Sequence, residues 1–279
     1  MKISPRLPTA LLATSALLLV AGTMHIRNGA DSSATRSNVV VGVASAAQIP
    51  RAQQMRQLDP SNLPGHSFYF TRGAYSGGGW RSGWATDAPQ ADRWIINVIK
   101  RLTLLDVYPR ENYVAFDDPD LRRFPFLYIL EVSSMGLSDA EVQGLRDYLL
   151  AGGFLMVDDF WGSSEWAAWE REIRAVLPEY DIVEISPDHP IFETVYKVDE
   201  VLQVPNVGNA RRGITSERDG TVPHLRGIFD DKGRLMVAIN WNTDIGDAWE
   251  WAEDPYYPVT YSTYAYKMAA NFFVYAMTH

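Results

Sequence analysis

Short apolar runs alternate with amphipathic stretches along residues 66–279. The runs have the length of strands, and the stretches between them repeat apolar side chains every three or four positions, as one face of a helix does. The predicted strands are residues 67–71, 112–115, 126–132, 154–159 and 234–240. Strands that alternate with helices in this way predict an α/β fold with a mostly parallel central sheet covered on both faces.

Four helices are predicted from this spacing and from their end signals. Asp87 is a suitable N-cap for the first helix, and Ser138 and Glu141 form a capping box that opens the second. Ser164 is the expected cap of the third, and aromatic residues at helical spacing form the fourth, which closes the chain. Residues 181–230 are expected to form short strands and loops. The apolar face expected for the first helix consists of Ile95, Val98, Leu102 and Leu105.

The first 65 residues lack this pattern. A charged N-terminus precedes an apolar run at residues 10–21, which is short for a membrane span and typical of a secretory signal. Small residues at positions 43–47 resemble a cleavage site. We expect a signal peptide at residues 1–47, cleaved or retained as an inner-membrane anchor, a linker at 48–65 and one α/β domain at 66–279. The protein is then exported, to the periplasm or the cell exterior.

Composition excludes several classes of function. The net charge of −9 falls to −12 if residues 1–47 are removed, and such an acidic chain repels the nucleic acid backbone. The chain has no cysteine, so it has neither disulfides nor a thiolate nucleophile. Its histidines are scattered and form no zinc motif. We therefore expect no cofactor, no bound metal, no nucleic acid partner, and membrane contact only through an uncleaved leader.

Three unusual segments follow predicted strands, at residues 68–84, 158–166 and 240–258. They are rich in glycine, tryptophan and carboxylates. Because the strand-to-helix loops of a parallel sheet all emerge at its carboxyl edge, where open α/β sheets bind ligands, we expect the segments to form one site. The expected ligand-binding residues are Arg72, Trp80, Arg81, Trp84, Asn240, Asp244 and Asp247.

The chemistry of the first two segments stays open. The glycines of residues 73–79 match neither a P-loop nor a dinucleotide fingerprint. They belong either to a flexible loop whose tryptophans fold back onto the domain, or to the wall of a ligand site. Asp158 and Asp159 either cap the next turn or act as paired carboxylates that bind a cation, share a proton or hold a sugar hydroxyl. No catalytic residue is assigned; the candidates are Asp158, Asp159 and His189.

Several motifs agree in order with a known family. The segments "FYFTRGAYSGGGWRSGW", "YLLAGGFLMVDDFWG", "SPDHPIF" and "NWNTDIGDAWEWAEDPYYP" resemble domain-of-unknown-function family 4159 over about residues 66–279. The family is similar to the class I glutamine amidotransferase-like superfamily and, more distantly, to trehalose-utilisation (ThuA-like) proteins. The resemblance implies a three-layer, flavodoxin-like fold in an exported or membrane-linked bacterial protein. It also suggests MoxR-type ATPases and von Willebrand A-type proteins as partners in a cell-envelope complex.

The superfamily places its catalytic cysteine on the turn after a central strand. Asp158 and Asp159 stand about there in this chain, which has no cysteine, so glutamine amidotransferase activity is excluded. Whether the protein is an enzyme stays open. We expect a non-catalytic domain of the bacterial cell envelope that binds a glycan or a protein partner. The alternatives are a carbohydrate-active or metal-assisted hydrolase that uses Asp158 or Asp159, with His189 or Asp244 in support, and a purely structural domain.

Overall fold

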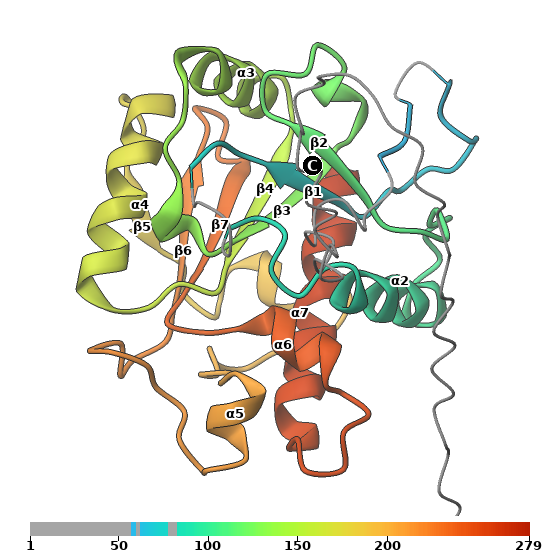
Figure 1. Ribbon diagram of the computed structural model, residues 1–279. Coiled ribbons are helices and arrows are strands. Elements are labelled where there is room, and N and C mark those ends of the chain that lie inside the picture. The colour runs from blue at the N-terminus through green and yellow to red at the C-terminus, as the bar shows by residue number, and fades with distance from the viewer. Residues whose placement is uncertain (1–56, 60–61, 78–82) are drawn as a thin grey trace, which may run out of the picture. The chain divides into compact units, whose positions relative to one another are not determined.

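The computed structural model describes residues 57–59, 62–77 and 83–279, which all belong to one compact unit spanning residues 48–279 (Figure 1). The predicted signal peptide, much of the linker, and the candidate ligand residues Trp80 and Arg81 lie outside the described residues. None of the described helices is long and apolar enough to cross a membrane.

A seven-stranded sheet forms the centre of this unit, in the order β2-β1-β3-β4-β7-β6-β5. Its strands are β1 (Thr71–Ala74), β2 (Asn112–Ala115), β3 (Phe126–Leu130), β4 (Phe154–Asp158), β5 (Ile182–Glu184), β6 (His224–Phe229) and β7 (Leu235–Trp241). The strands from β2 to β7 in this order are parallel, and β6 and β5 continue the sheet in antiparallel fashion. The predicted α/β fold with a mostly parallel sheet is confirmed.

Helices cover both faces of the sheet (Figure 1). They are α2 (Gln90–Leu102), α3 (Asp139–Leu150), α4 (Gly162–Val176), α5 (Val207–Ala210), α6 (Ile245–Glu250) and α7 (Val259–Thr278), with single 3-10 turns at Leu121–Arg123, Val132–Ser134 and Pro190–Phe192. The buried residues of α2, α6 and α7 form one core cluster, and those of α3 and α4 form another. Strand β4 contributes to both clusters, because successive side chains of a strand point to opposite faces of the sheet. Phe154 and Met156 face the first cluster, and Leu155 and Val157 face the second.

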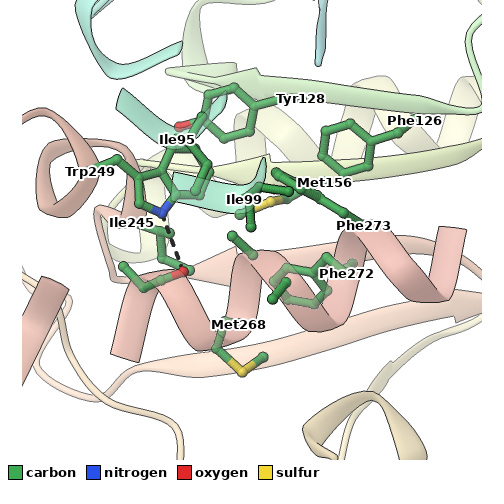
Figure 2. Close-up of a cluster of buried hydrophobic side chains, with 14 of the residues drawn as sticks. Ile95, Ile99, Phe126, Tyr128, Met156, Ile245, Trp249, Met268, Phe272 and Phe273 are labelled. Atoms are coloured by element: carbon green, nitrogen blue, oxygen red, sulfur yellow. Dashed lines mark hydrogen bonds between the residues drawn. The ribbon is translucent and has the colours of Figure 1, made fainter. Parts of the chain in front are cut away.

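Aromatic side chains pack together with aliphatic ones in the core on the α2, α6 and α7 side (Figure 2). Phe126 of β3 lies 4.6 Å from Phe273 of α7, measured between ring centroids, in an edge-to-face arrangement. Trp249 of α6 packs against Tyr128, and its indole Nε1 donates to the backbone oxygen of Ala265 at 3.2 Å. The short helix α6, which the sequence pattern did not reveal, is therefore fixed to both the sheet and α7.

The helix caps predicted from the sequence were only partly right. The capping box of Ser138 and Glu141 is present at the start of α3. Asp87 does not cap α2, because it adopts a left-handed backbone conformation and Pro89 takes the N-cap position without a side-chain bond. Ser164 does not cap α4 either, since the helix begins earlier, at Gly162, with Trp161 as its N-cap.

The buried face of α2 also differs from the predicted one. Ile95, Ile96 and Ile99 are buried, whereas Val98 is only half-buried. The helix packs against both α6 and α7 as well as the sheet, so its buried stripe widens towards those neighbours. The first strand also lies later in the chain than predicted: β1 spans Thr71–Ala74 instead of residues 67–71, and Phe68 forms only an isolated bridge with Val107.

Gly144 lies in the middle of α3 where the helix meets the backbone after β2. A Cβ atom at this position would overlap the carbonyl oxygen of Phe116, which is backbone and cannot move aside as a side chain would. We expect Gly144→Ala to lower the free energy of unfolding by about 1–3 kcal/mol, although alanine is the better helix former. Urea denaturation measures this, with Gly65→Ala, a site with open space around it, as the control. Equal stability of the two variants would contradict the close approach.

Candidate functional site

The carboxyl ends of β1, β3, β4 and β7 meet at one edge of the sheet, called the carboxyl edge below, because these strands are parallel. Within the three segments singled out in the sequence, the described residues that follow β1, β4 and β7 lie at this edge, as predicted. Seven acidic residues from its loops interact with one another and form the acidic cluster. They are Asp87, Glu131, Asp158, Asp159, Asp244, Asp247 and Glu250.

Asp158, the last residue of β4, is fully buried and anchors the start of α6. Its Oδ1 accepts from the backbone N–H of Ile245 at 3.2 Å, and its Oδ2 accepts from the N–H of Gly246 at 2.9 Å and from the hydroxyl of Tyr128 at 3.0 Å. Burial raises the pKa of Asp158 to about 7, against the effect of these hydrogen bonds. The side chain has no free face for a ligand, so its role in this arrangement is to hold the edge together.

Asp244 and Asp247 tie α6 to its surroundings. Asp244 is the N-cap of α6 and accepts from the N–H of Asp247 at 2.8 Å, while Asp247 Oδ2 accepts from the N–H of Val207, at the start of α5, at 2.6 Å. Burial and the charge of Asp159 raise the pKa of Asp244 well above its ordinary value. Burial and the charge of Asp87 raise the pKa of Asp247 to about 7.

A row of left-handed residues follows the three central strands. Glu131, Asp159 and Asn242 are the first residues after β3, β4 and β7, with φ values of 54°, 46° and 61°. Backbone bonds link the row, since Glu131 N donates to Asp159 O at 3.1 Å and Asp159 N donates to Thr243 O at 3.2 Å. Residues other than glycine adopt this backbone conformation at a cost of about 1–3 kcal/mol, and residues strained in this way gather at functional sites.

Glu131 and Asp159 are half-buried residues, unlike the buried Asp158 and Asp244, and Asp159 Oδ1 accepts from the indole Nε1 of Trp161 at 3.0 Å. Burial and the nearby charge of Glu165 raise the pKa of Glu131 to about 7. Burial and the charge of Glu131 raise the pKa of Asp159 well above its ordinary value. Raised pKa values favour the neutral form of these carboxyl groups, which donates as well as accepts hydrogen bonds.

Arg72, predicted to bind a ligand, is completely buried. Its Nε and Nη2 each lie 2.8 Å from Asp92 Oδ1, and its Nη1 donates to the backbone oxygen of Trp84 at 2.8 Å and to that of Thr86. The guanidinium also lies 5.3 Å from the centroid of the Tyr128 ring. These contacts hold residues 84–86, at the end of the glycine-rich segment, against α2.

The remaining predicted residues lie in different surroundings. Trp84 is half-buried and packs 5.0 Å from the ring of Tyr113, measured between centroids. Asn240 is buried within the sheet, where its Nδ2 donates to Val157 O at 2.9 Å. The ring of His189 lies 5.4 Å from that of Phe229, which pairs with the first residue of β7, at the opposite edge of the sheet. His189 is thus about 20 Å, the length of β7, from the acidic cluster.

Sequence reasoning missed Glu131, Asp87 and Glu250 as members of the cluster. Glu131 was detectable, because it directly follows the buried run of β3 and so had to lie at the same edge as Asp158. Carboxyl oxygens of Asp87, Asp247 and Glu250 lie within 4.8 Å of one another. Carboxyl groups this close are able to share a proton or to bind a cation.

The sequence model of the family described as "Domain of unknown function (DUF4159)" matches residues 71–277, which include the whole sheet and the acidic cluster. A search of curated proteins finds none that matches this chain.

Proposed function

Because the chain belongs to the DUF4159 family, whose description states no activity, we propose a function from the site itself. The domain is a non-catalytic binding module of the bacterial cell envelope, and its carboxyl edge binds a hydroxyl-rich ligand of the glycan class. The exported location follows from the leader-like residues 1–47. The family resemblance adds MoxR-type ATPases and von Willebrand A-type proteins as partners of the same module.

One observation supports the binding site most strongly. Glu131 and Asp159 stand side by side on left-handed turns, partly accessible, with raised pKa values. A sugar presents hydroxyl groups that both donate and accept, and a neutral carboxyl group matches both roles because it donates through its O–H and accepts through its carbonyl oxygen. The half-buried Trp84 adds an aromatic surface on the loop after β1.

The strand order supports a remote relationship to the flavodoxin-like class I glutamine amidotransferase superfamily. The five parallel strands follow the order 2-1-3-4-7, in which the first four agree with the flavodoxin-like arrangement. We infer that the domain is a flavodoxin-like relative of the class I glutamine amidotransferases in which Asp159 stands at the position of the lost cysteine. A domain of this kind keeps the ligand-binding edge of the superfamily without its thiol chemistry.

Isothermal titration of the protein against neutral, N-acetylated and amino-sugar oligosaccharides tests the proposal. A hydrogen bond to a charged group contributes about 1.5–3 kcal/mol, so Glu131→Ala and Asp159→Ala are each expected to weaken binding about 10- to 100-fold. Asp231→Ala, at the exposed β6–β7 turn on the opposite edge, is the control and should bind as the wild type does. Absence of binding to the whole panel, or equal loss in the control, would refute the glycan site.

A second candidate is a carbohydrate-active hydrolase, favoured by Asp159 in particular. It occupies a strained turn between a central strand and a helix, as the nucleophile of many α/β hydrolases does, and its pKa is raised as expected for an acid–base group. His189 is too distant to assist it. Turnover of the same oligosaccharides that is abolished by Asp159→Ala but kept by Asp231→Ala would select this function over binding alone.

A further inference from the structure

The two carboxyl oxygens of Asp159 have different surroundings. Oδ1 accepts a hydrogen bond from the indole Nε1 of Trp161 at 3.0 Å. Oδ2 forms no hydrogen bond with any residue that the structure describes, and it is not one of the enclosed side-chain atoms without a partner in that part of the chain. Because Asp159 as a whole is half-buried, Oδ2 is the oxygen left for solvent or a ligand.

Trp161 holds its indole in a fixed place. It is the N-cap of α4 and is almost completely buried. Its backbone N–H donates to Glu165 Oε2 at 2.5 Å, so both its backbone and its ring are held at the start of the helix. An indole N–H donates and never accepts, so the oxygen of Asp159 that it meets must be an acceptor.

The surroundings of Asp159 favour a neutral carboxyl group. Neither Arg72 nor Arg218 neutralises it, because these cations pair with Asp92 and Glu165. Partial burial and the like charge of Glu131, whose backbone N–H donates to Asp159 O, both disfavour the carboxylate. These are also the two largest causes of the raised pKa of Asp159.

The indole decides where the proton of the neutral group sits. The carbonyl oxygen of a carboxylic acid is a better acceptor than its hydroxyl oxygen, so the bond from Trp161 makes Oδ1 the carbonyl and leaves the proton on Oδ2. We propose that Trp161 is a positioning residue that makes Asp159 a hydrogen-bond donor, and that the group it binds is the carbonyl oxygen of an N-acetylated sugar. This inference rests on the proposed function and names the class of sugar within it.

The donor at Oδ2 distinguishes three kinds of sugar. The carbonyl oxygen of an N-acetyl group only accepts, so it matches a fixed donor. The ammonium group of an amino sugar only donates, and it would meet the O–H of Asp159 without an acceptor. A hydroxyl group is able to accept as well, so an unmodified sugar is expected to bind with an affinity between the other two.

Isothermal titration at pH 7 tests this order with the trimers of N-acetylglucosamine, glucose and glucosamine, which differ only at carbon 2 of each sugar. The N-acetylated trimer is expected to bind at least about tenfold more tightly than the glucosamine trimer. Tighter binding of the glucosamine trimer would overturn the inference, because an ionised carboxylate attracts an ammonium group. Equal binding of all three would overturn this inference alone, whereas no binding of any trimer would refute the glycan site as well.

Asp159→Asn is the decisive variant. Its amide oxygen accepts from the indole and its NH2 group replaces the O–H, so the preference for the N-acetylated trimer should stay within about threefold of the wild type's. Asp159→Ala and Trp161→Phe, which remove the donor and the group that orients it, should both lose most of the preference. Trp166→Phe is the matched control, because that indole donates to Glu170. Equal loss in Asp159→Asn and Asp159→Ala would overturn the proposal.

The indole N–H resonance of Trp161, observed by NMR in 15N-labelled protein, tests the orientation without a ligand and without changing Trp161 itself. The resonance should keep the downfield position of a hydrogen-bonded donor in Asp159→Asn and should move upfield in Asp159→Ala, which has no acceptor at this position. An unmoved resonance in Asp159→Ala would show that the indole does not orient Asp159, and would overturn the role of Trp161.

Discussion

Arg72→Met is expected to lower the free energy of unfolding by about 3–5 kcal/mol, because it leaves the carboxylate of Asp92 buried without its partner. Both side chains of this ion pair are fully shielded from solvent. The variant also removes the donors to the backbone oxygens of Trp84 and Thr86. Urea denaturation followed by circular dichroism measures the change, and an unchanged m-value shows that the same structure unfolds.

Two further variants test whether the loss of stability comes from the buried Arg72–Asp92 ion pair. Arg123→Ala removes an exposed ion pair with Asp120 and is expected to cost less than about 1 kcal/mol. Replacing both buried partners, in Arg72→Met with Asp92→Leu, should recover most of the lost stability, since apolar residues of similar volume often replace a buried pair without penalty. A stable Arg72→Met protein would show that Arg72 is free to serve a ligand, as the sequence alone had suggested.

Asp158→Ala is expected to lower the free energy of unfolding by about 3 kcal/mol or more. Three donors, the N–H groups of Ile245 and Gly246 and the hydroxyl of Tyr128, lose their acceptor in a fully buried position, and each unsatisfied donor costs about 1–3 kcal/mol. Asp158→Asn is the matched control. The asparagine keeps one acceptor oxygen and resembles the protonated acid, so we expect the free energy of unfolding to fall by only about 1 kcal/mol.

Thermal or urea unfolding at pH 6, where Asp158 is mostly protonated, compares the two Asp158 variants most cleanly. If Asp158→Ala were as stable as Asp158→Asn, the carboxyl would not anchor α6. In that case the carboxyl edge would have to be held by the apolar contacts of α6 alone, such as those of Trp249.

The position of the site was predictable, and its chemistry was not. Continuous apolar runs such as that of β4 identify buried parallel strands. The loops that follow parallel strands all lie at one edge of the sheet, whatever the sequence of the loops. Burial of Arg72 could not be predicted, because its partner Asp92 is twenty residues away and their pairing depends on how α2 docks. A charged residue in a strand next to a glycine-rich loop looks the same in sequence whether it faces solvent or a buried partner.

The failed helix caps have a related cause. Asp87 and Ser164 satisfy the local preference for an N-cap, but the tertiary fold sets the backbone path at both. Ser164 is exposed in the first turn of α4, which already begins at Gly162. The backbone of Asp87 is left-handed, and its carboxylate lies within 4.8 Å of those of Asp247 and Glu250. Tertiary structure thus overrides a local preference, which is the kind of conflict expected where a site is built for function.

The central claim is that carboxyl groups from separate loops meet at one edge of the sheet and hold protons at neutral pH. A pH titration of the protein labelled with 13C at its carboxyl carbons, followed by NMR, measures this group by group. The account predicts midpoints near pH 7 for Glu131, Asp158 and Asp247. Midpoints below pH 5 for all three, the range of exposed carboxylates, would contradict it.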